Sequence, residues 1–544
     1  MMPAVPGSDK EADLNKNRAA TGPKQVPLPH DFKDISAALT ENEAYLRQEF
    51  TNYADIVFRD FYTGDIRCLA VWIDGLINER VSQDIFHALM LDLPREQIQN
   101  ASPSSRADFM NQHLLPFHST ARVIDLVELK RWIMMSKMVL LIDGCPVGLM
   151  LDAEAAPMRS IAEPSMEASV AGPRDCFVEP LRINTALIRS RLGDSRLKSE
   201  NYILGRRSNT LVNLMYIEDI ARPEIVEEAR QRIERIDIDG MLDSNYLKEL
   251  IQDEPFSLFP LMKNTERPDK VAADLLEGKF ALIVDGSPMV LTAPCLFGEF
   301  LQAADDHYNN PLVVWLLRFI RYVSYITATT LPGVYVAVTT YHQEMIPIPL
   351  VFSIAAARQS IPFPTLFETM LMLFGFELLS ETGIRLPRMI GPIGGMLGAL
   401  IMGQIAIMAG FVSSSVAIVV AITAVSNFVL GAGYALASPI RLIRMVFLLA
   451  GGALGLYGIN LIGLASLVHL TTLRSFGVSY LAPWAPLRLQ EMKDLIYRAP
   501  RWDLTMRPAL IAGEDLVRSN TPMPSPSAGH PSSRGGAPRK RGEK

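Results

Sequence analysis

Charged residues are scarce in this chain. Asp, Glu, Lys and Arg make up 20% of its 544 residues, whereas an average soluble domain carries about 25%. Hydrophobic residues reach 49% and the mean hydropathy is +0.17. The apolar excess must be concentrated in one part of the chain, which excludes a wholly soluble protein and an intrinsically disordered one.

Cysteine is equally scarce. The four cysteines, Cys68, Cys145, Cys176 and Cys295, lie too far apart for a disulfide framework or a zinc site. Reduced thiols of a cytosolic protein are the simplest interpretation. Residues 1–35 lack the apolar core of a signal peptide and are rich in Pro, Lys, Asp and Asn, which predicts a disordered N-terminal arm over 1–40.

Catalytic and ligand-binding patterns are also missing. His113 and His118 are five residues apart and have no acidic or cysteine partner nearby, which argues against a metal site. The net charge is −6 and aromatic residues do not alternate with basic ones, so no nucleic-acid partner is expected. We therefore predict no catalytic residue, no metal and no cofactor.

Long runs without charge distinguish the C-terminal part of the chain. Before about residue 311, charged residues recur every few positions, as in a water-soluble domain. A membrane helix needs about 20 apolar residues, and three later runs without Lys, Arg, Asp or Glu are long enough: 389–411, 412–436 and 445–470. A fourth run, 312–340, has Arg318 and Arg321 in its first turns and is expected to cross from about Phe319.

The segment 361–381 is more difficult, because it carries Glu368, Glu377 and Glu381. Intramembrane carboxylates are costly unless they face protein or water. We therefore expect an interfacial or re-entrant helix, with a full span as the competing interpretation.

The two interpretations give four or five spans, and the basic residues do not decide between them. Basic residues precede the first span and follow residue 470, which places both ends inside and favours four spans. Arg441 and Arg444 would then lie outside, whereas a five-span chain would place them inside. The topology stays open.

The part before residue 311 contains an internal duplication. MVLLIDGCPVGLML (138–151) and FALIVDGSPMVLTA (280–293) each predict two strands around an Asp-Gly turn. Residues 67–90 and 210–233 each predict a strand, an acidic turn and a helix, at nearly the same offset. The predicted organisation is α/β subdomain 1 (41–151), a linker (152–176), α/β subdomain 2 (177–310), an all-α multi-span membrane domain (311–470), a cytosolic C-terminal segment (471–510) and a disordered basic tail (511–544).

Six blocks of the chain occur in the order typical of one protein family. They are GPRDCFVEPLRINTALIRSRL (172–192), YIEDIARPEIVEEARQRIERIDIDGMLDSNYLKELI (216–251), TERPDKVAADLLEGKFALIVDGSPMVL (265–291), YVAVTTYHQEMIPIPLVFSIAAARQSIPFP (335–364), ETGIRLPR (381–388) and RSFGVSYLAP (474–483). Over about residues 41–508 the chain resembles the A subunit of the GerA-type spore germination receptors.

This resemblance implies a receptor component and not an enzyme. A subunits of the family work with a transporter-like B subunit, which holds the nutrient pocket, and with a lipoprotein C subunit, in the inner membrane of the spore. The resemblance also implies that the A subunit forms an oligomeric cation channel, with five copies as the implied number, that opens when nutrient is sensed. Membrane lipids are the remaining expected partner.

One stripe of the helix expected over 412–436 is the pore-lining candidate. Its members recur at steps of four and three: Val416, Val420, Thr423, Asn427 and Gly431. Aliphatic residues followed by small polar ones suit a constriction that gates by dewetting. The alternative is that Thr423 and Asn427 hydrogen-bond across a helix interface.

Glycines and charges supply the other candidates. Small residues four apart allow close helix packing, and this role is expected for Gly391, Gly394, Gly395, Gly398, Gly451 and Gly455. Glu368, Glu377 and Glu381 would concentrate cations at a channel mouth, or form the solvated edge of an interfacial helix. For Arg318 and Arg321 we expect binding to lipid phosphates, with contact to the soluble domain of a neighbouring subunit as the alternative.

Overall fold

The chain divides into two compact units, which are described separately. The computed structural model describes residues 34–92, 103–114, 120–153, 167, 172–385, 398, 401, 403–430 and 434–524. One unit comprises residues 1–51 and 55–156, and the other comprises residues 52–54 and 157–544.

The first unit contains a five-stranded antiparallel sheet in the order β1-β2-β4-β5-β3. Its strands are β1 Ile56–Thr63, β2 Ile66–Ile73, β3 Thr120–Val123, β4 Met138–Ile142 and β5 Gly148–Leu151. Its helices are α2 Leu39–Glu49, α3 Glu79–His87, η1 Ala88–Asp92, α5 Pro103–Leu114 and α6 Leu126–Met134. The predicted hairpin at the Asp-Gly turn is confirmed: β4 pairs with β5, and Gly144 takes the positive φ of +78° that the turn requires.

The second unit repeats this sheet in the order β6-β7-β9-β10-β8. Its strands are β6 Leu197–Leu204, β7 Thr210–Ile217, β8 Lys263–Thr265, β9 Phe280–Val284 and β10 Val290–Ala293. The helices around it are α7 Leu181–Arg189, α8 Pro223–Glu234, α9 Ser244–Ile251 and α10 Pro268–Leu276. Equivalent strands occupy equivalent places in both sheets, so the two subdomains share one topology.

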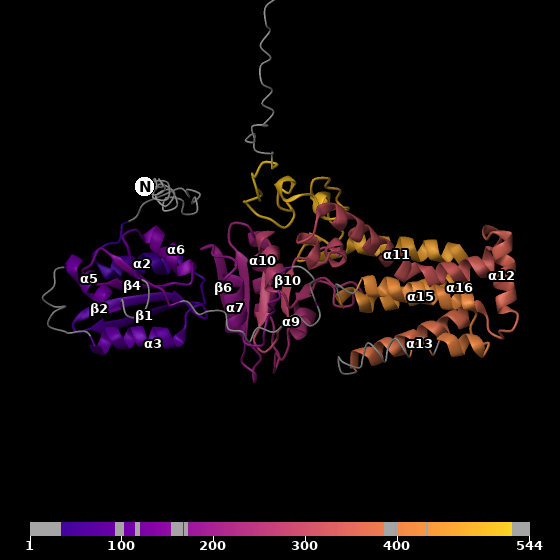
Figure 1. The fold of residues 1–544 in the computed structure, drawn as a ribbon, viewed down its shortest axis with the longest axis horizontal. Coiled ribbons are helices and arrows are strands. Elements are labelled where there is room, and N and C mark those ends of the chain that lie inside the picture. Colours follow the sequence, from indigo (N-terminus) through magenta and orange to yellow (C-terminus); the bar gives the residue numbers. More distant parts are fainter. Residues whose placement is uncertain are drawn as a thin grey trace, which may run out of the picture. The chain divides into compact units, whose positions relative to one another are not determined.

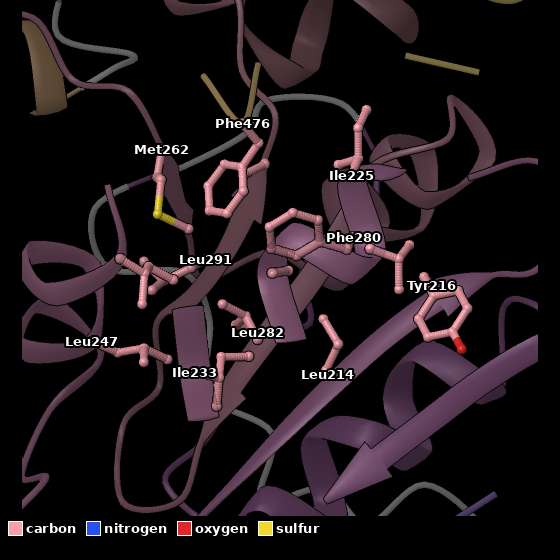
Figure 2. Packing of buried hydrophobic residues seen from close by; sticks show 14 of the residues in the cluster. Leu214, Tyr216, Ile225, Ile233, Leu247, Met262, Phe280, Leu282, Leu291 and Phe476 are labelled. Carbon is pink, nitrogen blue, oxygen red and sulfur yellow. The ribbon is translucent and has the colours of Figure 1, made fainter. Parts of the chain in front are cut away.

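The second sheet is covered on both faces, which explains its nearly continuous apolar strands. Figure 2 shows Leu214 and Leu282 of the sheet packed with Ile233 and Leu247 of the helices on one face. Helices α7 and α10 cover the other face. Phe476, from beyond the helical region, packs edge-on against Phe280 with ring centroids 4.9 Å apart, so the C-terminal segment returns to this sheet.

The helical region follows two short helices, η2 Phe297–Leu301 and η3 Ala304–His307. It consists of α11 Pro311–Tyr341, η4 Gln343–Met345, α12 Ile348–Arg358, α13 Thr365–Arg385, α15 Ser414–Val429 and α16 Tyr434–Thr472. α11 packs against α16 and α15, while α12 lies across one end of these helices (Figure 1). By length and composition, two helices, Pro311–Tyr341 and Leu436–Thr472, could cross a membrane.

The long helix α16 is broken at Gly455. This residue has φ +63° and ψ −147°, a backbone conformation that only glycine adopts easily. A Cβ built on Gly463 would lie 4.0 Å from Phe447 Cε1, whereas a straight helix would separate these residues by about 24 Å. α16 is therefore a hairpin of two antiparallel helices, 434–454 and 456–472.

The hairpin corrects the expectation of one uninterrupted span over 445–470. Gly455 provides the reversal, and it also packs closely, because a Cβ there would lie 2.8 Å from His342 Cε1 and 3.1 Å from Tyr341 Cβ. Gly451 packs closely as well, because a Cβ there would meet the carbonyl of Gly333 in α11, and a Cβ on Gly398 would lie 2.7 Å from Leu379 Cδ2. Gly391, Gly394 and Gly395 lie outside the described residues, as does most of the expected span 389–411.

After the hairpin the chain returns to the second sheet. This segment contains β11 Arg474–Ser475, β12 Val478–Ser479, η5 Glu491–Asp494 and η6 Arg501–Asp503. Leu470 and Leu473 at the end of α16 share one apolar cluster with Leu436 at its start and with Phe297 of η2. Both ends of the hairpin therefore lie at the end of the bundle nearest the sheet.

The segment expected to be interfacial is α13, and it packs within the bundle. It contacts α11, α15 and α16, and Leu373 is 1% exposed among Val336, Val416 and Leu448. α13 therefore belongs to the same bundle as α11, α15 and α16. The expected helix over 412–436 is shorter than expected, because α15 ends at Val429.

We expect Gly451→Ala to lower the thermal unfolding midpoint of the detergent-solubilised chain. The added methyl group would meet the Gly333 carbonyl and lie 3.0 Å from Ile459 Cδ1, and overpacking of this kind costs about 1–3 kcal/mol. Gly403→Ala is the matched control, because a Cβ there has no other atom within 4 Å. Equal midpoints for the two variants would contradict the close packing of α11 on α16.

Candidate functional site

Three charged groups, two of them fully buried, join the second subdomain to the first long helix. Asp306 of η3 and Arg318 of α11 are both 0% exposed. Arg321 Nη1 and Nη2 donate to the two carboxylate oxygens of Asp306 at 2.7 and 2.8 Å, and Arg318 Nε donates to Asp306 Oδ2 at 3.1 Å. One carboxylate thus holds two guanidinium groups, an arrangement that we call the Asp306 clamp.

The C-terminal segment completes the clamp from the other side. Arg318 Nη2 donates to Asp494 Oδ1 at 3.2 Å, and Arg318 Nη1 donates to the main-chain oxygen of Asp494. Burial alone would raise the pKa of Asp306, but the hydrogen bonds and charges of Arg321 and Arg318 outweigh it and hold that pKa below its usual range. The clamp therefore ties η3, α11 and η5 together in one polar cluster.

The clamp corrects the expectation that Arg318 and Arg321 bind lipid phosphate. Arg318 has no exposed surface, and both guanidinium groups are bound to a carboxylate of the same chain. Burial of two arginines without a counter-charge would be prohibitive, so the first turns of α11 are committed to Asp306. The sequence offered one signal for this, an acidic residue 12 and 15 positions before the two arginines.

A second buried ion pair lies inside the helical bundle. Arg444 of α16 has a side chain that is 3% exposed, and its Nη1 lies 3.3 Å from Glu377 Oε1 of α13. Arg444 Nε donates to the main-chain oxygen of Ala328 at 2.8 Å, and Nη2 donates to Asn427 Oδ1 of α15 at 3.4 Å. Arg441 lies 3.1 Å from the other oxygen of Glu377. One polar network therefore connects α11, α13, α15 and α16.

The three acidic candidates occupy three different environments. Glu377 belongs to the network around Arg444. Glu368 is 0% exposed and accepts a hydrogen bond from the Ser413 main chain at the start of α15, with Arg358 Nε 3.9 Å away. Glu381 is exposed. The structure does not bring them together into a single acidic mouth.

The expected pore-lining stripe faces the interior of the bundle. Val416, Val420 and Thr423 are 0%, 4% and 0% exposed, and Asn427 is bound to Arg444. Gly431 lies outside the described residues. On the single chain the first three residues are therefore covered by their own bundle, and their pore-lining role stays a prediction.

The exposed side of α15 is instead an apolar stripe. Ile418, Ile422 and Val425 are 60%, 47% and 62% exposed. α12 has no buried face: most of its 11 residues are apolar, and none of them is buried. The surface of the helical region is therefore apolar, while its charged residues Arg444 and Glu368 lie inside.

Among the described residues, no group of three His, Cys, Asp or Glu side chains is placed to hold a metal ion. The four cysteines are free thiols and all are buried. Burial raises the pKa of the Cys68 thiol to about 12, with a smaller contribution from Asp143, so this thiol stays protonated near neutral pH.

Comparison with known proteins assigns the chain to a family. The family model described as "Bacillus/Clostridium GerA spore germination protein" matches residues 44–510. The chain belongs to the GerA family. Spore germination protein KA of Bacillus subtilis (strain 168) is 38% identical over 499 residues, which are 91% of this chain and 90% of that protein.

Other relatives of this GerA-family chain include spore germination protein B1 of Bacillus subtilis (strain 168). It is 35% identical over 89% of this chain and 99% of its own length. A crystal structure of the N-terminal domain of the A subunit of the Bacillus megaterium spore germinant receptor GerK3 matches 49% of this chain and 99% of that domain. Its sequence is 30% identical and its TM-score is 0.40. The resemblance read from the six sequence blocks is thus confirmed at the level of the family.

We expect Asp306→Asn to destabilise the GerA-family chain by about 3 kcal/mol at pH 7, because it leaves Arg321 without its carboxylate partner and Arg318 with Asp494 alone. The pKa of Asp306 is lowered in the folded state, so its stabilising contribution is present above the unfolded pKa of about 3.9 and is lost as pH falls through the folded pKa. The difference between the wild-type and variant unfolding midpoints should therefore narrow below about pH 4.

Asp503→Asn is the matched control. Asp503 pairs with Lys493 at 2.7 Å, and both side chains of this pair are substantially exposed. This variant should keep the wild-type midpoint at pH 7. An Asp306→Asn protein as stable as the Asp503→Asn protein would contradict the clamp.

Proposed function

We propose that this chain is the A subunit of a nutrient-sensing spore germination receptor, and that its helical region spans the inner membrane of the spore and forms an oligomeric ion channel. The germination role rests on the family. By the same family resemblance, a transporter-like B subunit and a lipoprotein C subunit are its partners, and no enzymatic step is assigned to the chain.

The observation that carries the membrane proposal is the polarity of the bundle. Arg444 and Glu368 are buried, whereas Ile418 and Ile422 of α15 are exposed and no residue of α12 is buried. In water such a surface would drive aggregation. In a bilayer the apolar side chains contact lipid or another copy, and intramembrane charges pair inside the bundle.

The hairpin at Gly455 supports a topology with both ends on one side. α13 and α15 each run opposite to α11. The earlier residues Leu373 and Val416 lie at the level of Val336, which is late in α11. The later residues Glu377 and Asn427 share the Arg444 network with Ala328, which is earlier in α11. The first half of α16 then leaves the sheet and the second half returns to it. With one further crossing between α13 and α15, we propose six.

Six crossings remove the conflict that the sequence posed. Arg441 and Arg444 lie in the half of α16 nearer the sheet, on the same side as the basic segment after residue 470. Both groups then obey the rule that basic residues stay inside. Neither the four-span nor the five-span topology satisfies both.

For the pore, we keep α15 as the lining helix and move the lining face. The exposed stripe of Ile418, Ile422 and Val425 is available to surround an axis between copies, while Val416 and Val420 hold the helix against its own bundle. Aliphatic side chains around a narrow axis suit a constriction that gates by dewetting. The number of copies that close the pore, five by family resemblance, is part of the same proposal.

A signalling scaffold without its own pore is the second candidate. The Asp306 clamp favours it, because a buried bidentate pair would transmit a displacement of the soluble subdomain directly to α11. In this case the helices anchor the chain and pass the signal to the partner subunits.

Planar bilayer recordings of the purified chain separate the two candidates. We expect discrete cation currents, and we expect Ile422→Cys, but not Val420→Cys, to become blockable by a water-soluble thiol reagent. The native thiols are buried and should give no background. Absence of current under every condition would favour the scaffold. Block at Val420→Cys alone would mean that ions pass along the interior-facing side of α15 and not along Ile422.

A further inference from the structure

A cavity of about 440 Å³ lies in the second subdomain, beside the start of the helical region. Its walls come from α9, β8, α10, η2 and η3, and Ser438 of α16 also borders it. This volume lies in the usual range for sites that bind small molecules. The recording experiment above does not involve this cavity, and neither candidate function assigns it a role.

Most of the charges that line the cavity neutralise one another. Asp274 of α10 lies 2.9 Å from both Lys263 and Lys279, and Lys279 also lies 2.6 Å from Glu299. Glu167 pairs with Lys270 at 2.9 Å. These pairs form a wall with little net charge.

Glu277 and Glu266 complete this paired wall. Glu277 lies 3.6 Å from Lys279 and 3.5 Å from Arg518. One oxygen of Glu266 accepts the main-chain N–H of Glu167 at 2.9 Å. Both carboxylates therefore have partners, and the acidic side of the cavity is satisfied.

Lys248 of α9 is the exception. Within the described residues it makes no ion pair, and its ammonium group donates to Asn264 Oδ1 at 3.3 Å. Burial lowers the pKa of Lys248, as expected for a cation that lacks a counter-charge. An anion placed beside Lys248 would remove this unfavourable burial of an unpaired charge.

His307 adds a second unsatisfied group. Its Nδ1 is buried and has no hydrogen-bond partner among the described residues. Burial also lowers the pKa of His307, which favours the neutral ring. A neutral imidazole can donate one hydrogen bond to a ligand in the cavity.

The remaining walls are apolar. Ala273 of α10, Met289 in the turn before β10 and Phe300 of η2 line the cavity. They offer contact to a hydrocarbon body and no partner for a second charge. The walls therefore suit an anionic head with an apolar body.

We propose that this cavity binds a small organic acid, with its carboxylate on Lys248 and its apolar body against Ala273, Met289 and Phe300. The site is complete within the second subdomain. It stands whether or not the helical region conducts ions.

The position of the cavity connects its occupant to the Asp306 clamp. His307 lies on the cavity wall, and the preceding residue, Asp306, holds Arg318 and Arg321 of α11. A ligand that fixes His307 would therefore stabilise η3, and with it the hold on the first long helix.

The test is calorimetric titration of the full-length chain in nanodiscs with butyrate and with benzoate. We expect 1:1 binding of at least one of these acids, weakened at least tenfold by Lys248→Met. Ala273→Trp should abolish binding by filling the cavity without removing a charge. Leu276→Trp, on the same helix but outside the cavity, is the matched control and should bind within twofold of wild type.

Two further probes sharpen the result. Butyramide, which lacks the charge, and inorganic phosphate, which lacks the apolar body, should each bind at least tenfold more weakly than the better acid. Failure of both acids to saturate the wild-type chain, equal affinity in Lys248→Met or Ala273→Trp, or phosphate binding as tight as that of the acid would overturn the proposal. Currents play no part in this assay, so its failure is distinct from failure of the channel proposal.

Discussion

The pairing of Asp306 with Arg318 and Arg321 is the interaction on which the remaining architecture depends. It joins the end of the second subdomain to the beginning of the first long helix, because the one carboxylate of Asp306 binds both guanidinium groups. The same constraint recurs within the bundle, where Arg444 is bound by Glu377 from another helix. Charged side chains of this region thus pair with one another inside the bundle, and the apolar side chains on its exterior are available to contact lipid or other copies of the chain.

Gly455 is the second constraint, and it acts through the backbone. A positive φ turns α16 back on itself, so the C-terminal segment reaches the second sheet, where Phe476 packs on Phe280. Without this reversal residue 472 would lie at the far end of the bundle. The hairpin therefore returns the chain toward Arg318, which Asp494 contacts.

Local signals in the sequence predicted the α/β subdomains well. An Asp-Gly turn between two apolar strands is sufficient to specify β4–β5 and β9–β10, and the duplicated pattern carried over to one shared strand order. The contacts of the candidate site were harder to predict from the sequence. Gly455 is one of many glycines in apolar helices, and nothing local marks it as the one with positive φ. Glu377 and Arg444 are 67 residues apart, so their pairing depends on helix directions that a single sequence does not give.

Labelling of single cysteines from each side of oriented membrane vesicles tests the central claim, that the reversal at Gly455 brings both ends of the helical region to one side. The native thiols are buried, so the label reports the introduced residue. Gln490→Cys should react from the side of the soluble subdomains, and Glu344→Cys and Leu454→Cys from the opposite side. Reaction of Leu454→Cys from the same side as Gln490→Cys would contradict the account.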